Sequence, residues 1–176
     1  RSSVVPTAGG PVPSLMRVLP SIVLATMLIL AGATDAFAGW YSGSWLYRKA
    51  ITIDHLQVGS GPHTNFPVLI SITDANLSSK ALASGNDIVF TSSDGTTKLN
   101  HEIESYTSGT GALVAWVQIP SLSSSTDTVV YMYYGNSGAS NQQNVTATWE
   151  SNFKGVWHLN GVFTDSTSNA ANGTNT

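Results

Sequence analysis

The feature that most constrains the fold is a period of two in the placement of apolar residues, which runs through much of residues 46–134. In residues 66–72, for example, Phe, Val, Ile and Ile alternate with Pro, Leu and Ser. A period of two places successive side chains on opposite faces of a β-strand, so that one face can be buried. The sequence therefore predicts six strands, at residues 46–53, 66–73, 87–91, 98–106, 112–119 and 128–134.

Turn signals separate the predicted strands, and the clearest is Asp94-Gly95, which is typical of a tight hairpin. One short helical pattern, at residues 76–84, can be capped by Asp74 or Asn76. Parallel strands need long crossover connections, usually helices, and the sequence predicts none of these. We therefore expect an all-β fold, an antiparallel β-sandwich of the jelly-roll type, with an up-and-down barrel as the alternative.

The N-terminal part of the sequence has the pattern of a secretory signal peptide. Met16 and a basic residue precede an apolar run at residues 18–33, and a small-x-small site ends at Ala38. We interpret residues 16–38 as a signal peptide and residues 1–15 as an upstream or non-native segment. The alternative is a retained membrane anchor, but the run is shorter than the roughly 20 apolar residues of a span. The mature protein is therefore expected to be secreted, periplasmic or in the cell envelope, without a membrane span.

The composition changes after the last predicted strand. Residues 137–148 are rich in Gly, Ser, Asn and Gln, as in a linker. Residues 149–176 then begin a new apolar pattern, and one strand cannot bury itself. We therefore divide the mature chain into a sandwich at residues 39–136, a linker, and the truncated start of a second domain, which is expected to be weakly held or docked opportunistically.

The composition also excludes several classes of function. Charged residues make up 10% of the chain, the formal net charge is -3, and there is no cysteine. Nucleic-acid binders and basic membrane-surface helices need clustered Lys and Arg, so both classes are disfavoured. The absence of cysteine excludes disulfides, thiolate zinc sites and cysteine nucleophiles. Since no phosphate-binding loop or nucleophile elbow occurs either, we do not expect an enzyme.

Short segments in a fixed order carry a resemblance to a known family. They are Trp40, Trp45, YRKAITI at 47–53, NFPV at 65–68, DIVFT at 87–91, Asp94-Gly95, HEIE at 101–104, AWVQIP at 115–120 and YMYYGN at 131–136. Over residues 40–136 the chain resembles the domain of unknown function DUF2341. The resemblance implies an exported envelope protein, in some members attached to proton-channel type proteins. It implies no catalytic residues.

A second resemblance lies in GVWHLN at 155–160 and DST at 165–167. These residues are similar to the opening strand of concanavalin A-like, laminin G-type domains. That resemblance implies binding of carbohydrate or a surface ligand, often with calcium, by a neighbouring domain of which this sequence would hold only the start.

Aromatic side chains are the first candidates for ligand binding, because their faces stack on sugar rings. Trp40, Tyr41 and Trp45 lie together near the expected mature N-terminus, and Tyr134 ends the last predicted strand. We expect Trp40 and Tyr41 to be exposed. The alternative, which is favoured for Trp45, is that these large side chains fill the core.

Acidic residues supply the other candidates. Glu102 and Glu104 lie two apart on a predicted strand, so their carboxylates share one face about 7 Å apart, a separation used by inverting glycosidases. The favoured interpretation is instead a solvated or rim face that can contact a ligand. Asn86, Asp87 and Asp94 could supply oxygen ligands to calcium, although ordinary turn hydrogen bonds are the favoured interpretation. No other cofactor is expected.

These observations favour an exported, non-catalytic β-sandwich module that binds a polysaccharide or another cell-envelope ligand, or that spaces and presents a neighbouring laminin G-like domain. The alternative is a structural or interaction domain of an envelope assembly, held by its edge strands or by the laminin G-like partner, without a small ligand. A third hypothesis is a glycan-active enzyme that uses Glu102 and Glu104.

Overall fold

The computed structural model describes residues 39–174, so the expected upstream segment and signal peptide lie outside the described residues. Within the described range, the six predicted strands are confirmed, and three short helices accompany them. The elements in chain order are β1 (Tyr47–Ile53), the 3-10 helix η1 (His55–Gln57), β2 (His63–Thr73), α1 (Ala75–Lys80), β3 (Val89–Thr91), β4 (His101–Thr107), β5 (Ala112–Leu122), β6 (Thr128–Tyr134) and α2 (Val145–Thr148).

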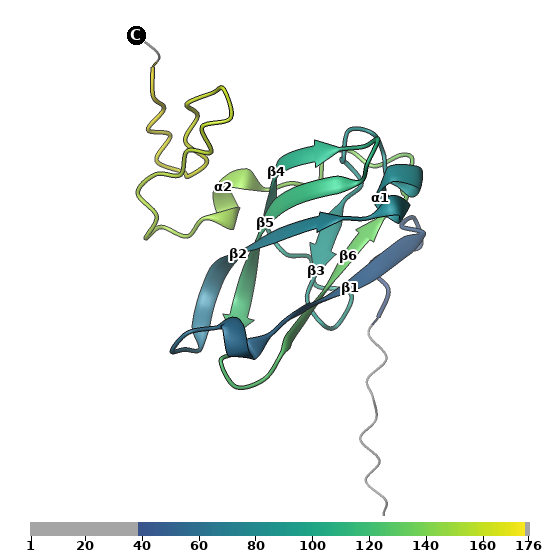
Figure 1. Ribbon diagram of the computed structural model, residues 1–176, viewed down its shortest axis with the longest axis horizontal. Coiled ribbons are helices and arrows are strands. Elements are labelled where there is room, and N and C mark those ends of the chain that lie inside the picture. Colours follow the sequence, from purple (N-terminus) through teal and green to yellow (C-terminus); the bar gives the residue numbers. More distant parts are fainter. Residues whose placement is uncertain (1–38, 175–176) are drawn as a thin grey trace, which may run out of the picture. The chain divides into compact units, whose positions relative to one another are not determined.

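The strands form two three-stranded antiparallel sheets, in the orders β1-β6-β3 and β2-β5-β4 (Figure 1). This arrangement confirms the predicted antiparallel β-sandwich. The helix α1 begins where expected, because the Asp74 side chain accepts a hydrogen bond from the Asn76 amide. It ends earlier than predicted, at Lys80, and the Leu82 amide beyond it donates to the Asp87 carboxylate.

The core lies between the sheets and follows the period of two. Along β5, Leu113, Ala115, Val117 and Ile119 are buried, whereas the side chains between them are half-buried. Trp116 is one of these outward-facing residues, so this large aromatic ring lies on the outer face of its sheet. The outer face of β5 and its neighbour β4 lies outside the core, so other segments of the chain can pack against it.

The predicted turn at Asp94-Gly95 is present, but it closes a single antiparallel bridge, between Thr91 and Lys98, instead of a full hairpin, because the next strand, β4, lies in the other sheet. The Asp94 carboxylate accepts hydrogen bonds from the Thr96 and Thr97 amides at 2.8 and 2.9 Å. Gly95 has φ +75°, and a Cβ there would lie 2.1 Å from the Gly39 carbonyl oxygen, so the position requires glycine.

The segment after β6 is not a free linker. Along β4, the Gln143 side chain accepts a hydrogen bond from the Ile103 amide, and the Asn144 amide donates to the His101 carbonyl. After α2, residues 149–174 contribute three buried polar residues, Asp165, Ser166 and Thr167. This segment packs on the sandwich through the contacts described below, and how firmly they hold it stays a prediction.

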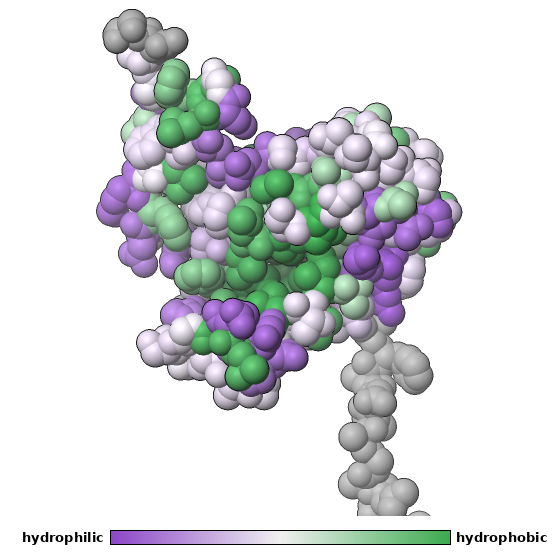
Figure 2. All heavy atoms as spheres, viewed as in Figure 1, coloured by the Kyte–Doolittle hydropathy of each residue, from purple (hydrophilic) through white to green (hydrophobic). Residues whose placement is uncertain are grey.

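One long edge of the sandwich is open. Both β1 and β2 end their sheets, so each has a strand partner on one side only. A groove of about 390 Å³ lies at this edge and is lined mainly by apolar side chains, among them Val58, Val68 and Leu122. Figure 2 shows apolar side chains gathered in a hollow on this face. We call this feature the edge groove.

Candidate functional site

The two glutamates identified in the sequence lie on the outer face of β4. Glu102 pairs across the sheet with Trp116 of β5, and Glu104 is the extra residue of an irregularity between Ile103 and Ser105. Such a β-bulge redirects the side chain of the extra residue. Both carboxylates contact the same histidine, His158, so the prediction that they share a face is confirmed.

Glu102 is only 7% exposed, which corrects the expectation of a solvated face. Its Oε2 accepts a 2.7 Å hydrogen bond from the indole nitrogen of Trp149, and its Oε1 accepts a 2.6 Å bond from the Ser166 hydroxyl. These donors come from the C-terminal segment, which covers this part of β4. A buried carboxylate is tolerated when hydrogen bonds of this kind replace its water.

Glu104 is less buried, with 28% of its side chain exposed. Its Oε2 accepts a 2.8 Å hydrogen bond from the indole nitrogen of Trp116 and lies 3.2 Å from His158 Nδ1. Its other oxygen, Oε1, has no hydrogen bond to any residue in the described part of the chain. Glu104 therefore keeps one oxygen for a ligand, whereas both oxygens of Glu102 are used within the protein.

The imidazole of His158 connects the two carboxylates. Its Nδ1 and Nε2 lie 3.2 Å from Glu104 Oε2 and Glu102 Oε1, respectively. The Nε2 atom is buried, and its contact with Glu102 does not have the alignment of a hydrogen bond. The ring also stacks on Trp116 at 6.4 Å between centroids and lies 6.1 Å from Trp149.

A pocket of about 180 Å³ opens beside this cluster. We call it the glutamate pocket. Asn160 and Thr164 join the two glutamates and His158 in its wall, and neither has a side-chain hydrogen bond within residues 39–174. Asp165 also lines it. Burial raises the pKa of Asp165, but hydrogen bonds, first from the Val156 and Thr167 amides, outweigh this effect and lower it to about 2.

The predicted calcium ligands do not form a site. Asp87 is fully buried, and its two oxygens accept hydrogen bonds from the Leu82, Gly135 and Asn136 amides. Asp94 is occupied by its own turn, where the Thr97 hydroxyl and amide hold the pKa of its carboxyl well below the usual range. Turn hydrogen bonds therefore explain Asp94, as the favoured interpretation expected, whereas Asp87 is held mainly by the amides of the distant segment after β6. Asn86 is half-buried, and its amide donates to the Ser84 hydroxyl.

The predicted aromatic surface is mostly internal. Tyr134 is 4% exposed and stacks on Tyr47, because it shares the inward face of β6 with Met132. This burial removes Tyr134 from the candidate ligand surface. Trp45 is also buried, and its indole nitrogen donates to the Asp87 carbonyl. It therefore belongs to the core, as the favoured alternative expected.

Trp40 and Tyr41 remain near the surface. Trp40 is 44% exposed, as expected, but its indole nitrogen donates to the Trp45 carbonyl and the Arg48 guanidinium lies 5.0 Å from its ring centroid. Tyr41 is only half-buried and packs edge-on against Trp45. Neither residue contributes to the glutamate pocket.

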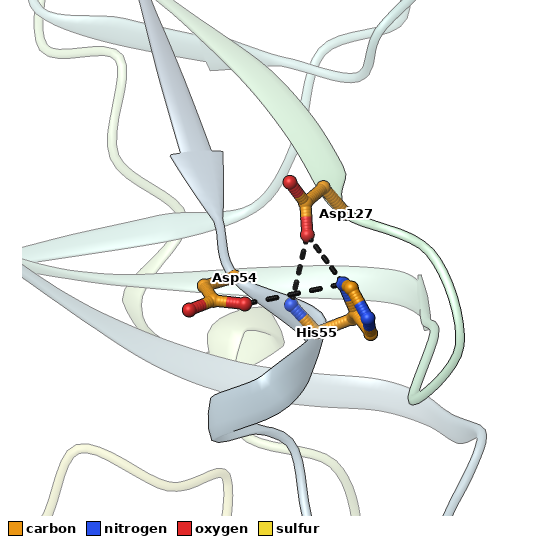
Figure 3. A group of neighbouring side chains, drawn as sticks. All are labelled: Asp54, His55 and Asp127. Atoms are coloured by element: carbon orange, nitrogen blue, oxygen red, sulfur yellow. Dashed lines mark hydrogen bonds and ion pairs between the residues drawn. The ribbon is translucent and has the colours of Figure 1, made fainter.

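A second polar group was not predicted. Asp54, His55 and Asp127 lie together where the connection after β1 meets the loop that joins β5 to β6 (Figure 3). His55 Nδ1 is 2.6 Å from Asp127 Oδ1 and 3.9 Å from Asp54 Oδ1, and the contact with His55 lowers the pKa of Asp127. His55 and Asp127 are 72 residues apart, so no local sequence signal links them. The three potential ligand atoms lie within 4.8 Å of one another, but all three residues are partly or fully exposed.

Comparison with protein families gives a match to residues 84–174, a little more than half of the chain, and the family is a domain of unknown function (DUF2341). The chain belongs to this family. All the residues that line the glutamate pocket lie inside the DUF2341 match. Comparison with curated proteins and with solved structures finds no match.

The family resemblance found in the sequence is thus confirmed, although the matched residues differ. The DUF2341 match begins after β2 and continues to residue 174, through residues whose composition predicts a linker and the start of a second domain. It gives no support for a concanavalin A-like or laminin G-type domain there. No helix among residues 39–174 has both the length and the apolar character required to cross a membrane.

Proposed function

We propose that this DUF2341 protein is an exported, non-catalytic module that binds carbohydrate in the glutamate pocket. One observation carries the proposal. Three polar side chains in the pocket wall, Glu104, Asn160 and Thr164, have donor or acceptor atoms that make no hydrogen bond to any of residues 39–174. A carboxylate oxygen, an amide and a hydroxyl are the groups that bind sugar hydroxyls.

The size of the pocket supports a small ligand. Its volume of about 180 Å³ suits one sugar unit rather than a long chain, so we propose that it binds a terminal residue or a side branch of a polysaccharide. The resemblance of residues 155–160 and 165–167 to laminin G-type domains points in the same direction. His158, Asn160 and Ser166 from these segments all line the pocket.

The hydrogen bonds favour binding over glycoside hydrolysis. An inverting glycosidase needs one carboxylic acid to protonate the leaving group and a second carboxylate to activate water. Glu102 is committed to Trp149 and Ser166, so it is not free for either role. If Glu102 gave up these hydrogen bonds to act as a catalyst, the C-terminal segment that forms part of the pocket wall would also be released.

Affinity electrophoresis of the full chain against a panel of soluble polysaccharides tests the proposal. At least one glycan should retard the protein, and the Glu104→Gln variant should lose this retardation. Asp127→Asn is the matched control, because it removes one exposed carboxylate that does not line the pocket. If no glycan retards the wild-type protein, or if both variants behave alike, carbohydrate binding in the pocket is rejected.

The edge groove supports a second candidate, a structural or interaction domain of an envelope assembly. Phe66 and Leu69 of β2 are 42% and 47% exposed, and β2 itself contains no Asp, Glu, Lys or Arg. Natural proteins usually protect such edges with charges, because a free edge can pair with a strand of another protein. Selective crosslinking to one envelope protein that is lost in Leu69→Lys and retained in Glu104→Gln would favour this candidate.

Export is proposed from the signal-peptide pattern alone. N-terminal sequencing of the protein recovered from its native compartment should begin at Gly39. If the protein is instead recovered from a membrane fraction and its N-terminus lies before the apolar run at residues 18–33, the retained anchor is favoured.

A further inference from the structure

We propose that the ligand of the glutamate pocket carries a free amino group, as in a glucosamine-type sugar, an inference that rests on the proposed function. The charge of the pocket wall is the first reason. Glu102, Glu104 and Asp165 line it, whereas none of its lining residues is Lys or Arg. His158 is the only lining residue that can become positive, so the carboxylates outnumber the positive charge even when His158 is protonated.

The three carboxylates are not equivalent. Asp165 accepts hydrogen bonds from three backbone amides and from the Thr167 hydroxyl, and Glu102 accepts from Trp149 and Ser166. Their charges are thus compensated by donors within the protein. Glu104 Oε1 is the carboxylate oxygen of the pocket that accepts no hydrogen bond from residues 39–174, and the other oxygen of Glu104 is fixed by Trp116.

This arrangement presents one oriented, partly desolvated carboxylate oxygen to the ligand. A charged N–H donor makes a shorter and stronger hydrogen bond to a carboxylate than a neutral hydroxyl does. Partial burial of Glu104 strengthens the attraction further, because less water screens it. An acetylated amine would lose the charge, and a uronic acid would add a repelling carboxylate.

Asn160 and Thr164 give the site its preference for a sugar. Each offers donor and acceptor groups that no described residue uses, at the wall that also holds Glu104. They can bind the hydroxyl groups that flank an amine on a sugar ring. A simple amine without a ring would bind Glu104 but would leave these groups to water.

Isothermal titration calorimetry of the full chain at mildly acidic pH tests the inference with four probes. These are a glucosamine disaccharide, its N-acetylated counterpart, a disaccharide that contains glucuronic acid, and lysine amide. We expect the glucosamine disaccharide to bind at least about tenfold more tightly than the other three. Glu104→Gln should abolish this preference, while Asp127→Asn should retain it. Because Gln still offers an acceptor to Trp116, the variant is expected to fold.

The outcomes separate this inference from the proposed function. Equal or tighter binding of the N-acetylated or glucuronate sugar would overturn the amino-group inference and leave carbohydrate binding intact. Equal binding of lysine amide would show that the ammonium group alone is recognised, which also overturns it. If neither these sugars nor any polysaccharide of the panel binds, the proposed function itself fails.

Discussion

The indole of Trp149 donates a 2.7 Å hydrogen bond to the carboxylate of Glu102, although 47 residues separate the two. The same carboxylate accepts a hydrogen bond from Ser166, 64 residues away. A single side chain of β4 thus fixes the C-terminal segment at two separate points. Because that segment supplies His158, Asn160 and Thr164 to the glutamate pocket, the pocket depends on this attachment.

Replacement of Glu102 by Leu should therefore destabilise the protein. The Trp149 and Ser166 donors would lose their acceptor, which is expected to cost about 2–4 kcal/mol in the free energy of urea unfolding. Trypsin should also cleave after Lys154 faster than in the wild type, because the segment around it is released. Glu102→Gln, which keeps one acceptor oxygen, should lose less. Unchanged stability and cleavage in Glu102→Leu would contradict the assigned role.

Asp87 should be structural and should not bind calcium. Asp87→Ala leaves the Leu82, Gly135 and Asn136 amides without their acceptor, at an expected cost of about 3 kcal/mol in unfolding free energy. Addition of calcium to the wild type should leave the thermal unfolding midpoint unchanged, because ligand binding to the folded state would raise it. A calcium-dependent rise that Asp87→Asn abolishes would restore the calcium hypothesis.

His101 should make the protein less stable at acidic pH. It is fully buried, and burial, aided by the charge of Lys98, lowers its pKa from 6.5 to about 4. As pH falls below 6.5, the unfolded chain takes up a proton that the folded protein accepts only near pH 4, so stability is lost across this window. The full loss is on the order of 3 kcal/mol.

Urea unfolding of wild type and His101→Phe at several pH values measures this effect. The free-energy difference between them should shift in favour of the variant as pH falls from 6.5 to about 4. His63→Gln, a change at a partly exposed histidine, is the matched control. A difference that does not vary with pH would show that His101 is not the source of the acid sensitivity.

Trp40→Ala should lower stability without affecting glycan binding. The ring of Trp40 packs edge-on against Tyr133, with 5.3 Å between the ring centroids, and the Arg48 guanidinium lies over its face. Its removal is expected to lower the free energy of unfolding by about 1–2 kcal/mol. Affinity electrophoresis of this variant should match the wild type. If a folded Trp40→Ala protein loses glycan binding, the site lies in the N-terminal aromatic cluster and not in the glutamate pocket.

The sequence by itself determined the features that depend on neighbouring residues. The period of two placed Leu113 and Ile119 in the core, because strand geometry alone sends alternate side chains to opposite faces. The turn at Asp94-Gly95 could be predicted because its hydrogen bonds and its positive φ arise within a few residues. The same alternation predicts the shared face of Glu102 and Glu104, and the irregularity at Glu104, which the sequence does not reveal, leaves both carboxylates beside His158.

Tertiary structure alone decided which faces are covered. The sequence predicts Tyr134 and Glu102 as surface residues. Tyr134 is buried because it lies on the inward face of β6, and Glu102 is buried because the C-terminal segment covers it. The pairing of His55 with Asp127 arises in the same way. The contacts of Glu102 with Trp149 and of His55 with Asp127 join residues 47 and 72 positions apart. Their partners are chosen by packing and by the need to satisfy buried polar groups, which no local pattern encodes.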